Sequence, residues 1–277
     1  MNLKIASWNI EGRLTNDDIS TRSTPDSIIS EIKKINADIL VLPEAHNNLR
    51  LENLQSLKKL EALGYKIYSV KYNDDTPHRT DSFYKDLSIS LLSKLPVEKF
   101  EAIRPADQRS LILATVKIKN DKLIRVIGLH LDDRSEKTRI DQMNGLIPII
   151  NSQQIPTIIM GDFNAMHGED LWPAKFLRSP IIKFLVKIFS KKLGVRATEM
   201  ATGTAINLLE KNTNLTDADP KHQPTTTPKI RGYNYLPSIR LMQIDHIFVS
   251  PEIKISNFEI SKDGGADHRA ISVNIDL

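Results

Sequence analysis

Short polar segments follow several apolar runs of this sequence, and they are rich in carboxylate, amide and imidazole side chains. Such side chains transfer protons and hold divalent cations. Catalytic and binding residues are concentrated in loops, which begin where strands end, so these segments are the candidate site. In chain order they are Ser7-Trp8-Asn9, Leu42-Pro43-Glu44, Gly128-Leu129-His130, Gly161-Asp162-Phe163-Asn164 and the late pair Ile244-Asp245 and Asp267-His268.

Each segment alone also has an ordinary structural explanation. A lone histidine after an apolar strand, such as His130, is commonly a hydrogen-bonded core residue, and Asp162 with Asn164 can form a side-chain-capped turn. Asp245 is harder to explain in this way, because it lies within the apolar run 244–249 and a buried carboxylate needs a partner. Only the whole set of segments, in this order, indicates a function.

The order of these segments resembles the endonuclease/exonuclease/phosphatase superfamily, which includes DNase I-like nucleases, AP endonucleases, sphingomyelinases and inositol polyphosphate phosphatases. The pattern of that superfamily is W-N, then Glu, then His or Tyr, then G-D-F-N, then I-D-(Y/H)-I, and finally S-D-H. The resemblance extends from Asn2 to Ile275, which is nearly the whole chain. The matching residues are Trp8-Asn9, Glu44, His130, Gly161 to Asn164, Ile244 to Ile247 and Ala266-Asp267-His268.

Three positions depart from the usual pattern of the superfamily. Pro43 stands where Gln is usual, and Ala266 replaces the usual Ser. His130 takes the place that Tyr holds in members of the AP-endonuclease type. This last difference favours the branches of the DNase I, tyrosyl-DNA phosphodiesterase and sphingomyelinase types, without choosing among them.

The resemblance implies a Mg²⁺-dependent hydrolase of phosphate esters that acts by in-line attack of water. Glu44 would hold the cation with help from Asn9 and Asp267. Mg²⁺ prefers one or two carboxylates and retains several waters, so a sparse oxygen site suits it; Mn²⁺ is the expected substitute. The cation would bind a phosphate oxygen and offset charge in the transition state.

The resemblance also implies catalytic roles for other residues of the pattern. Asp162 would orient and deprotonate the attacking water as a general base. Asn164 would donate a hydrogen bond to the phosphate or the water, and His130 would donate to another phosphate oxygen. His268 would act as a further donor, with Asp245 fixing its tautomer and raising its pKa.

The elements that must position these residues follow from the hydrophobic periodicity. The result is an α/β (α+β) pattern in one domain, 1–277, and the resemblance implies a two-sheet β-sandwich flanked by helices, the DNase I-like four-layer architecture, with the site at one end. Strands are expected at 3–8, 38–42, 65–70, 87–92, 111–118, 124–131, 157–160, 244–249, 253–260 and 271–275. Helices are expected from Thr24 to Ile35, over 51–60, and over 135–150 with Ile140, Met143, Ile147 and Ile150 facing the core.

The composition is that of a globular protein, with 277 residues of which 40% are hydrophobic and 26% are charged. A net charge of +4 and a pI of about 9.0 slightly favour a polyanionic partner such as nucleic acid. The absence of cysteine excludes disulfides, cysteine metal sites and thiol catalysis. Neither a signal peptide nor a membrane-spanning run is recognised, so a cytoplasmic location is expected.

The substrate is left open between alternatives. A nuclease acting on DNA or RNA is favoured by the basic pI. A phospholipid or inositol-phosphate phosphodiesterase or phosphatase, of the sphingomyelinase type, is the alternative, because the basic amphipathic segment 172–193 could lie on a membrane surface. We favour the interpretation that this segment packs over the core with solvated lysines. A catalytically inactive binding module is disfavoured, because the expected catalytic residues are all present.

Other polar residues carry weaker signals. The tract 223–228 has turn chemistry and hydroxyl groups, and it could line a substrate groove or form an ordinary loop. Four basic residues are candidates for contacting phosphate, although a solvated surface charge is the simpler interpretation of each: Arg109, Arg134, Lys229 and Arg240. The remaining histidines have no paired spacing that suggests a zinc site: His46, His78, His167, His222 and His246.

Overall fold

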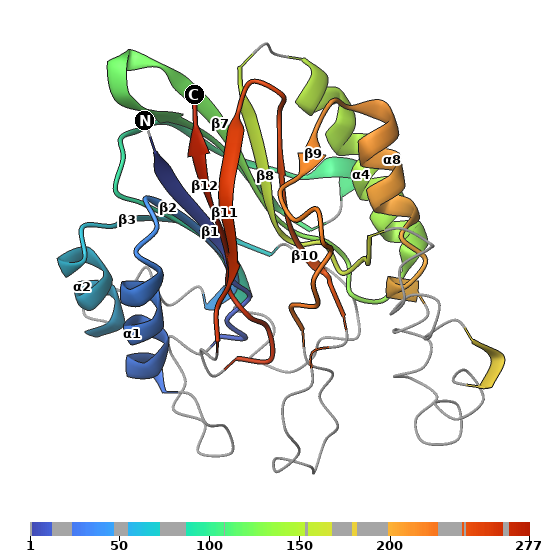
Figure 1. The fold of residues 1–277 in the computed structure, drawn as a ribbon, viewed down its shortest axis with the longest axis horizontal. Helices are drawn as coiled ribbons and strands as arrows, with labels where there is room; N and C mark the ends of the chain where they lie inside the picture. Colours follow the sequence, from blue (N-terminus) through green and yellow to red (C-terminus); the bar gives the residue numbers. More distant parts are fainter. Residues whose placement is uncertain are drawn as a thin grey trace.

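Two β-sheets of six strands each form the centre of the computed structural model (Figure 1). The structure describes residues 2–12, 24–46, 55–72, 87–107, 109–152, 155–167, 179–181, 199–226, 240, 242–262 and 266–277. The strand order is β11-β12-β1-β2-β4-β3 in the first sheet and β5-β6-β7-β8-β10-β9 in the second. The strands are β1 (Leu3–Ser7), β2 (Ile39–His46), β3 (Lys66–Lys71), β4 (Leu87–Ser93), β5 (Val97–Ile103), β6 (Leu111–Lys117), β7 (Leu123–His130), β8 (Thr157–Asp162), β9 (Thr216–Asp217), β10 (Asp245–Val249), β11 (Lys254–Ile260) and β12 (Ile271–Asp276).

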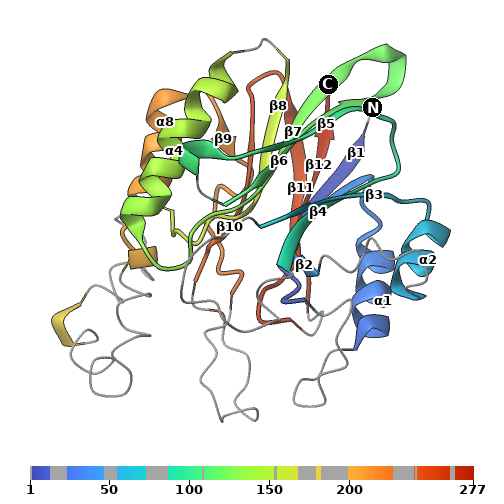
Figure 2. The same cartoon turned by 180° about the vertical axis from the view of Figure 1, so that it is seen from behind.

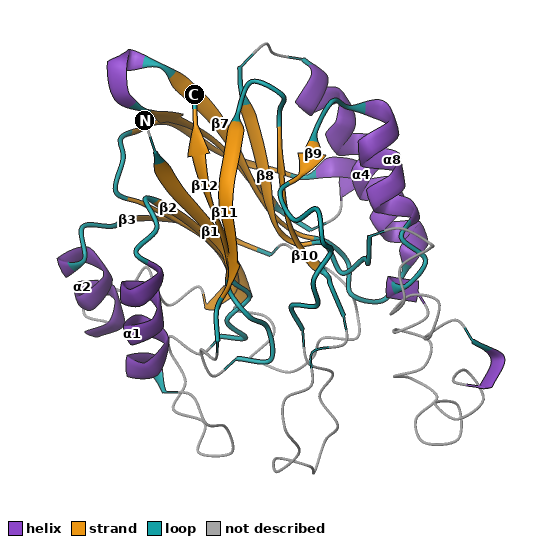
Figure 3. Cartoon of the chain, in the orientation of Figure 1, coloured by secondary structure: helices purple, strands orange, loops and turns teal. Residues whose placement is uncertain are grey.

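Helices cover the outer face of each sheet, which gives four layers (Figure 3). The helices α1 (Pro25–Ile35) and α2 (Gln55–Ala62) pack on the first sheet. The helices α4 (Glu136–Asn151) and α8 (Thr204–Asn212) pack on the second. The view from behind shows the two pairs at opposite sides of the sandwich (Figure 2). The α/β sandwich expected from the resemblance is therefore confirmed.

The strand β2 shows why a continuous apolar run forms a buried strand here. Successive side chains of a strand point to opposite faces. Ile39 and Val41 accordingly lie in the core between the two sheets, whereas Leu40 and Leu42 pack under α1. Both faces of this strand are covered, so neither face carries the polar residues that would produce an alternating pattern.

Each sheet contains one parallel pair of strands, β1 with β2 and β7 with β8, and its other neighbouring strands are antiparallel. Parallel strands end at the same edge of their sheet, so His130 and Asp162 finish β7 and β8 side by side. The strand β10 runs the opposite way and begins at this edge with Asp245. The topology thus gathers residues that are far apart in the sequence at one end of the sandwich.

The strands β5 and β9 and the helix α8 were not predicted from the sequence. The strand β5 is a partly exposed edge strand with the sequence VEKFEAI, and its charged residues hide the strand pattern. The helix α8 buries only Ala205, Ile206 and Leu209, which is too short an apolar series to stand out. The strand β9 has two residues and exists only through its pairing with β10.

The helix α4 buries a face that differs from the expected one. The guanidinium of Arg139 donates to the carboxylate of Glu136 at 2.7 Å, and Glu136 also accepts the amide N–H of Ala205 at 3.0 Å. Such partners offset the free-energy cost of burying charge. Hydrophobic periodicity considers apolar residues alone, so it could not predict that Glu136 and Arg139 are buried. Of the four apolar residues expected to face the core, Met143 and Ile150 are buried, and Ile140 and Ile147 are not.

The basic amphipathic segment 172–193 lies outside the described residues, apart from residues 179–181. Its packing on the core and the alternative contact with a membrane surface therefore stay predictions. In the part of the chain that the structure describes, no helix combines the length and the apolar character needed to cross a membrane.

Gly161 precedes Asp162 in β8, at a point where the backbone of β7 leaves no room for a side chain. Its φ is +152°, and a Cβ placed on it would lie 1.9 Å from the carbonyl oxygen of Leu129. We expect Gly161→Ala to break the pairing of β7 with β8 and to abolish the cooperative unfolding transition in urea. The control is Gly64→Ala, where the nearest atom is 3.9 Å away and the left-handed φ costs about 1–2 kcal/mol. Equal stability of the two variants would contradict this explanation.

Candidate active site

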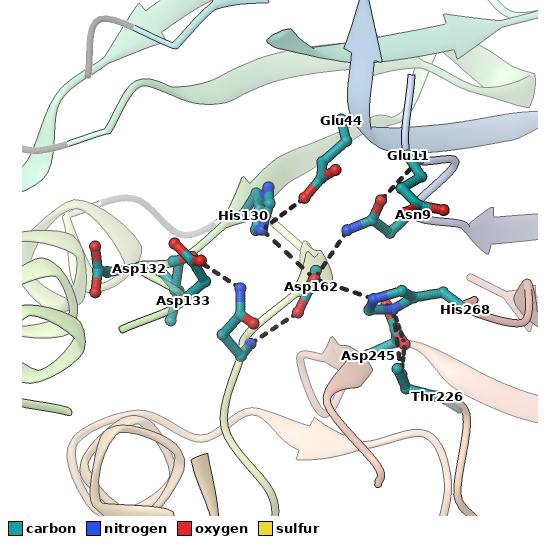
Figure 4. Close-up of polar contacts among 12 residues, drawn as sticks. Asn9, Glu11, Glu44, His130, Asp132, Asp133, Asp162, Thr226, Asp245 and His268 are labelled. Carbon is teal, nitrogen blue, oxygen red and sulfur yellow. Dashed lines mark hydrogen bonds and ion pairs between the residues drawn. The ribbon is translucent and has the colours of Figure 1, made fainter. Parts of the chain in front are cut away.

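Asp162 lies at the centre of a polar cluster to which both sheets contribute (Figure 4). Strand pairing sets His130 on one side of Asp162 and Asp245 on the other. Asn9, in the loop after β1 of the first sheet, donates its amide N–H to Asp162 Oδ2 at 3.0 Å. The convergence of loops from both sheets at one end of the sandwich is therefore present.

The carboxylate of Asp162 is surrounded by donors although it is almost fully buried. Its Oδ1 accepts the backbone N–H of Asn164 at 2.8 Å. Its Oδ2 lies 3.5 Å from His130 Nε2 and 3.8 Å from His268 Nε2. Burial raises the pKa of Asp162 to about 6, even though the charge of His268 acts in the opposite direction. A carboxylate with this pKa is a competent proton acceptor near neutral pH.

His268 is held from behind by Asp245. The ring Nδ1 lies 2.8 Å and 3.0 Å from the two carboxylate oxygens, so Nδ1–H donates to Asp245. The indole N–H of the buried Trp8 donates to the carbonyl oxygen of His268 at 3.1 Å and fixes its backbone. Burial disfavours the charged ring, but Asp245 and Asp162 outweigh this and raise the pKa of His268 well above its usual value. The two carboxylates therefore favour the charged form of the ring, and its Nε2 is directed toward Asp162.

Two buried threonines that the sequence analysis did not assign complete the setting of Asp245. The hydroxyls of Thr225 and Thr226 donate to Asp245 Oδ2 at 2.7 Å and 3.0 Å. Both belong to the hydroxyl tract 223–228, of which residues 223–226 are described. The described part of the tract supports the carboxylate, and the run of hydroxyls was the only signal for it in the sequence.

Glu44 projects from a β-bulge in β2. The register with β4 shifts between Leu42 and Ala45, and Glu44 has a φ of +55°. A bulge re-aims a side chain and tolerates a residue without an N–H, which explains why Pro43 is compatible with this strand. Glu44 Oε1 reaches to 3.8 Å from His130 Nε2. Glu44 and Asp162 therefore face the same small space.

Tyr72 fixes both Glu44 and His130, and no motif pointed to it. Its hydroxyl oxygen accepts the backbone N–H of Glu44 at 2.9 Å and lies 3.0 Å from His130 Nδ1. Burial raises the pKa of the Tyr72 phenol, so the group keeps its proton. Within the described contacts of this hydroxyl, His130 Nδ1 is the acceptor for that proton. The network thus assigns His130 the Nε2–H tautomer, which turns its N–H toward Asp162 and Glu44.

Arg109 is buried, and its interpretation as a solvated surface charge is wrong. Its guanidinium donates to the carbonyl oxygen of Leu131 at 3.0 Å and lies 5.0 Å from the centre of the Tyr72 ring. A further contact of 3.5 Å reaches Asp133. Arg109 therefore braces the end of β7 and the ring of Tyr72 from behind.

Acidic groups crowd around Glu44. Burial raises the pKa of Glu44 to about 7, and the nearby charges of Asp267 and Glu11 add to the effect. The side chain of Asn9 links Glu11 to Asp162, because its Oδ1 accepts the backbone N–H of Glu11 at 3.1 Å while its amide N–H donates to Asp162. Concentrated carboxylate charge of this kind is what a hard divalent cation offsets, and oxygen donors are the ligands that such a cation prefers. The residues present therefore fit the cation that the resemblance implies.

The structure brings the predicted site residues into one region, although their sequence positions span most of the chain. Asn164 has a left-handed backbone with a φ of +48°, and its amide N–H donates to the carbonyl of Leu131 at 3.0 Å. Of the other basic candidates, Arg240 is exposed, Arg134 is partly exposed at the start of α4, and Lys229 lies outside the described residues. The residues gathered are Asn9, Glu44, His130, Asp162, Asn164, Asp245, Asp267 and His268.

The raised pKa of Glu44 predicts a stability cost that depends on pH. An unfolded glutamate ionises near its ordinary pKa of 4.5, whereas folded Glu44 keeps its proton up to about pH 7. The unfolded state therefore binds fewer protons in this window, and folding stability falls as pH rises through it. Without divalent cations, we expect Glu44→Gln to stabilise the protein at pH 8 by up to about 3 kcal/mol and to have little effect at pH 4.5.

Urea unfolding in EDTA at the two pH values measures this difference. The matched control is Glu252→Gln, because Glu252 is exposed and its substitution should change stability little at either pH. A Glu44→Gln variant that is less stable than the parent at pH 8 would show that the carboxylate is not under electrostatic stress.

Solved structures with the same fold include proteins of several stated activities. A protein from Beutenbergia cavernae DSM 12333, described as an endonuclease/exonuclease/phosphatase, has a TM-score of 0.69 at 18% identity and covers 100% of this chain and 72% of its own. A 3′ phosphatase from Neisseria, solved with a product DNA hairpin, has a TM-score of 0.64 at 17% identity over 99% and 100% of the two chains. A mannosyl-6-phosphatase from Bacteroides thetaiotaomicron VPI-5482 has a TM-score of 0.61 at 15% identity over 99% and 100%.

No match was found among curated proteins. The TM-scores of the solved structures show a shared fold, and their low identities limit the likeness to the fold. The family model of the Endonuclease/Exonuclease/phosphatase family matches residues 6–268, a span that contains every residue of the cluster around Asp162. The chain therefore belongs to the endonuclease/exonuclease/phosphatase family, a family of phosphoester hydrolases.

Proposed function

We propose that the protein is a divalent-cation-dependent hydrolase that cleaves a P–O bond of a phosphate ester by in-line attack of water. The observation that carries this proposal is the buried carboxylate of Asp162, which faces two imidazole N–H groups and a group of acidic side chains in one small space. This arrangement combines a proton acceptor, hydrogen-bond donors for phosphate oxygens and a group of oxygen ligands for a cation.

Asp162 is the general base in this proposal. With a pKa of about 6, it is ionised at neutral pH and can accept a proton from a water molecule as that water attacks phosphorus. The new bond joins the water oxygen to phosphorus, and the old bond to the ester oxygen breaks. The leaving oxygen keeps the electron pair and takes its proton from solvent.

His268 and His130 are the donors for the phosphoryl oxygens. Asp245 stabilises the charged form of His268 and raises the pKa of its ring. His130 presents Nε2–H because Tyr72 occupies its Nδ1. Donors that are fixed before the reaction stabilise developing charge without a cost for reorganisation, and each is typically worth about 10²–10³ in rate. Asn164, whose backbone N–H donates to Asp162, would act as a further donor.

The cation is expected at the acidic group, with Glu44, Asp267 and Asn9 as the residues that hold it. Mg²⁺ is the expected ion because the donors are oxygens, and Mn²⁺ is the expected substitute. When bound, it supplies Lewis-acid stabilisation of a phosphoryl oxygen. Asn9 would present its amide oxygen, which in this structure accepts the N–H of Glu11.

Nucleic acid is the proposed substrate class. The net charge of +4 and the pI of about 9.0 suit a polyanion, and the similar 3′ phosphatase from Neisseria was solved with a DNA hairpin. The second candidate is a smaller phosphate ester, which the similar mannosyl-6-phosphatase favours. The phospholipid alternative depends on the segment 172–193, which lies outside the described residues.

The first test is hydrolysis of a substrate panel by the purified protein in Mg²⁺ and in EDTA. The panel contains single- and double-stranded DNA, RNA, 5′-tyrosyl DNA, sphingomyelin, inositol phosphates and a sugar phosphate. We expect cleavage of nucleic acid that requires Mg²⁺ and weakens steeply with salt as counterions are released. Asp162→Asn should lower kcat by about 10³-fold or more, because the base is lost, while the unfolding transition stays cooperative.

Different outcomes of the panel separate the parts of the proposal. Cleavage of a small phosphate ester alone would contradict the nucleic-acid assignment and keep the chemistry. Full activity of Asp162→Asn would contradict the role of the base. Full activity in EDTA, after removal of bound metal, would contradict the role of the cation.

Tyr72 provides a test of positioning rather than of direct catalysis. Tyr72→Phe removes the hydroxyl that sets the tautomer of His130 and accepts the N–H of Glu44. We expect kcat to fall about 10–100-fold with KM nearly unchanged and with a shifted pH profile. The control is Tyr68→Phe, because Tyr68 packs against Phe100 at the edge of the core, away from the site. Equal pH profiles for parent and Tyr72→Phe would remove the tautomer argument.

A further inference from the structure

A second cluster of titratable side chains lies on the outer face of the second sheet. Asp245 and His246 are neighbours in β10, so their side chains point to opposite faces. Asp245 faces the catalytic cluster. His246 packs against Phe163 and Phe248 on the side that α8 covers. The two clusters are therefore separated by the thickness of one sheet.

The outer cluster is built around Asp217 of β9. His246 Nδ1 lies 2.9 Å from Asp217 Oδ2, and its Nε2 lies 3.0 Å from the carbonyl oxygen of Ala165. The backbone N–H of Asp219 donates to the other carboxylate oxygen at 2.9 Å. These contacts hold the carboxylate of Asp217 in one orientation and leave lone pairs on both of its oxygens.

Two further histidines meet beside this carboxylate. His167 follows β8, and His222 lies in the turn after β9 with a left-handed φ of +48°. Their rings stack with centroids 3.7 Å apart. His167, Asp217 and His222 each offer one donor atom, and these atoms lie within 4.8 Å of one another. Modest side-chain rotation brings such atoms to the spacing of ligands around one ion.

Each of the two rings keeps a nitrogen that could bind a ligand. His167 Nε2 lies 2.9 Å from Glu210 Oε1 in α8, so this nitrogen donates its proton and Nδ1 keeps a lone pair. His222 Nδ1 is buried, has no hydrogen-bond partner among the described residues, and lies 4.0 Å from Asp217 Oδ2. A histidine whose other nitrogen is anchored by a carboxylate is the usual arrangement at metal sites.

We propose that His167, Asp217 and His222 form a binding site for a first-row transition-metal ion, with Zn²⁺ as the expected occupant. Two imidazoles and one carboxylate are a donor set that Zn²⁺ uses, with a fourth position filled by water or another oxygen. Imidazole donors do not suit Mg²⁺, which prefers oxygen. This site is therefore chemically distinct from the acidic group around Glu44, and it does not depend on the proposed hydrolysis.

The ion would tie together three separate segments of the chain. His167 lies three residues after Asn164 in the loop that leaves β8, whereas Asp217 and His222 belong to β9 and its turn. Glu210 brings α8 into the same arrangement through His167. The site thus braces, from the outer face, the loop that carries Asn164 on the catalytic side.

The test is zinc binding by the full chain in excess Mg²⁺, measured by competition with a chromophoric chelator. We expect one Zn²⁺ per chain with a sub-micromolar Kd, and Co²⁺ in its place should give the visible absorption of an imidazole-bound ion. Saturating Zn²⁺ should raise Tm by about 5 °C or more, because it binds only the folded state. His222→Asn and His167→Gln should each weaken zinc binding by at least about 100-fold. Asn tolerates the left-handed backbone at position 222, so that variant should fold.

Glu44→Gln is the matched control, because it removes an oxygen donor from the other cation site and leaves the outer cluster intact. Zinc binding that is retained in Glu44→Gln and lost in His222→Asn, with both variants folded by circular dichroism, supports the proposal. Three results would overturn it: no tight zinc binding by the parent, equal zinc binding by His222→Asn and the parent, or loss of zinc binding in Glu44→Gln.

Discussion

The carboxylate of Asp162 lies between the two β-sheets, where it is almost fully removed from water. A buried charge is costly unless it is paired and hydrogen-bonded. Several neighbouring groups supply such contacts to Asp162. Asn9 donates from the loop after β1, Asn164 donates from the turn after β8, and Nε2 of His268 lies 3.8 Å away. The charge of His268 depends in turn on Asp245. Compensation is incomplete, so the carboxylate retains a pKa near 6 and can act as a base.

The sheet topology makes this cluster possible. One parallel pair in each sheet directs the carboxyl ends of β1, β2, β7 and β8 toward the site, and the antiparallel strands β10 and β12 begin there. Side chains at strand ends inherit the rigidity of the sheets, whereas the loops beyond them can vary. The same topology explains the need for Gly161, because the paired backbones of β7 and β8 leave no volume for a Cβ beside Asp162.

The side chains of the cluster around Asp162 are held by partners from distant parts of the chain. Tyr72 is 58 residues from His130, and Thr225 is 20 residues from Asp245. Arg109 lies behind Tyr72. Such residues fix the tautomer and the orientation of the polar side chains in the cluster. The outer cluster of histidines follows the same rule, since 55 residues separate His167 from His222 and the tertiary fold alone stacks their rings.

The amino-acid sequence alone shows which chemical groups follow which strands, and in what order. Strand-end residues such as Asp162 and Asn164 carry a local signal, because an apolar run and the polar residues after it are adjacent in the chain. Asp245 was recognisable for the same reason, as a carboxylate inside an apolar strand. The tautomer of His130, the burial of the Glu136–Arg139 pair of α4 against α8 and the meeting of His167 with His222 follow from the tertiary fold. They depend on contacts between segments that are far apart in the chain, and such contacts leave no hydrophobic periodicity from which they could be predicted.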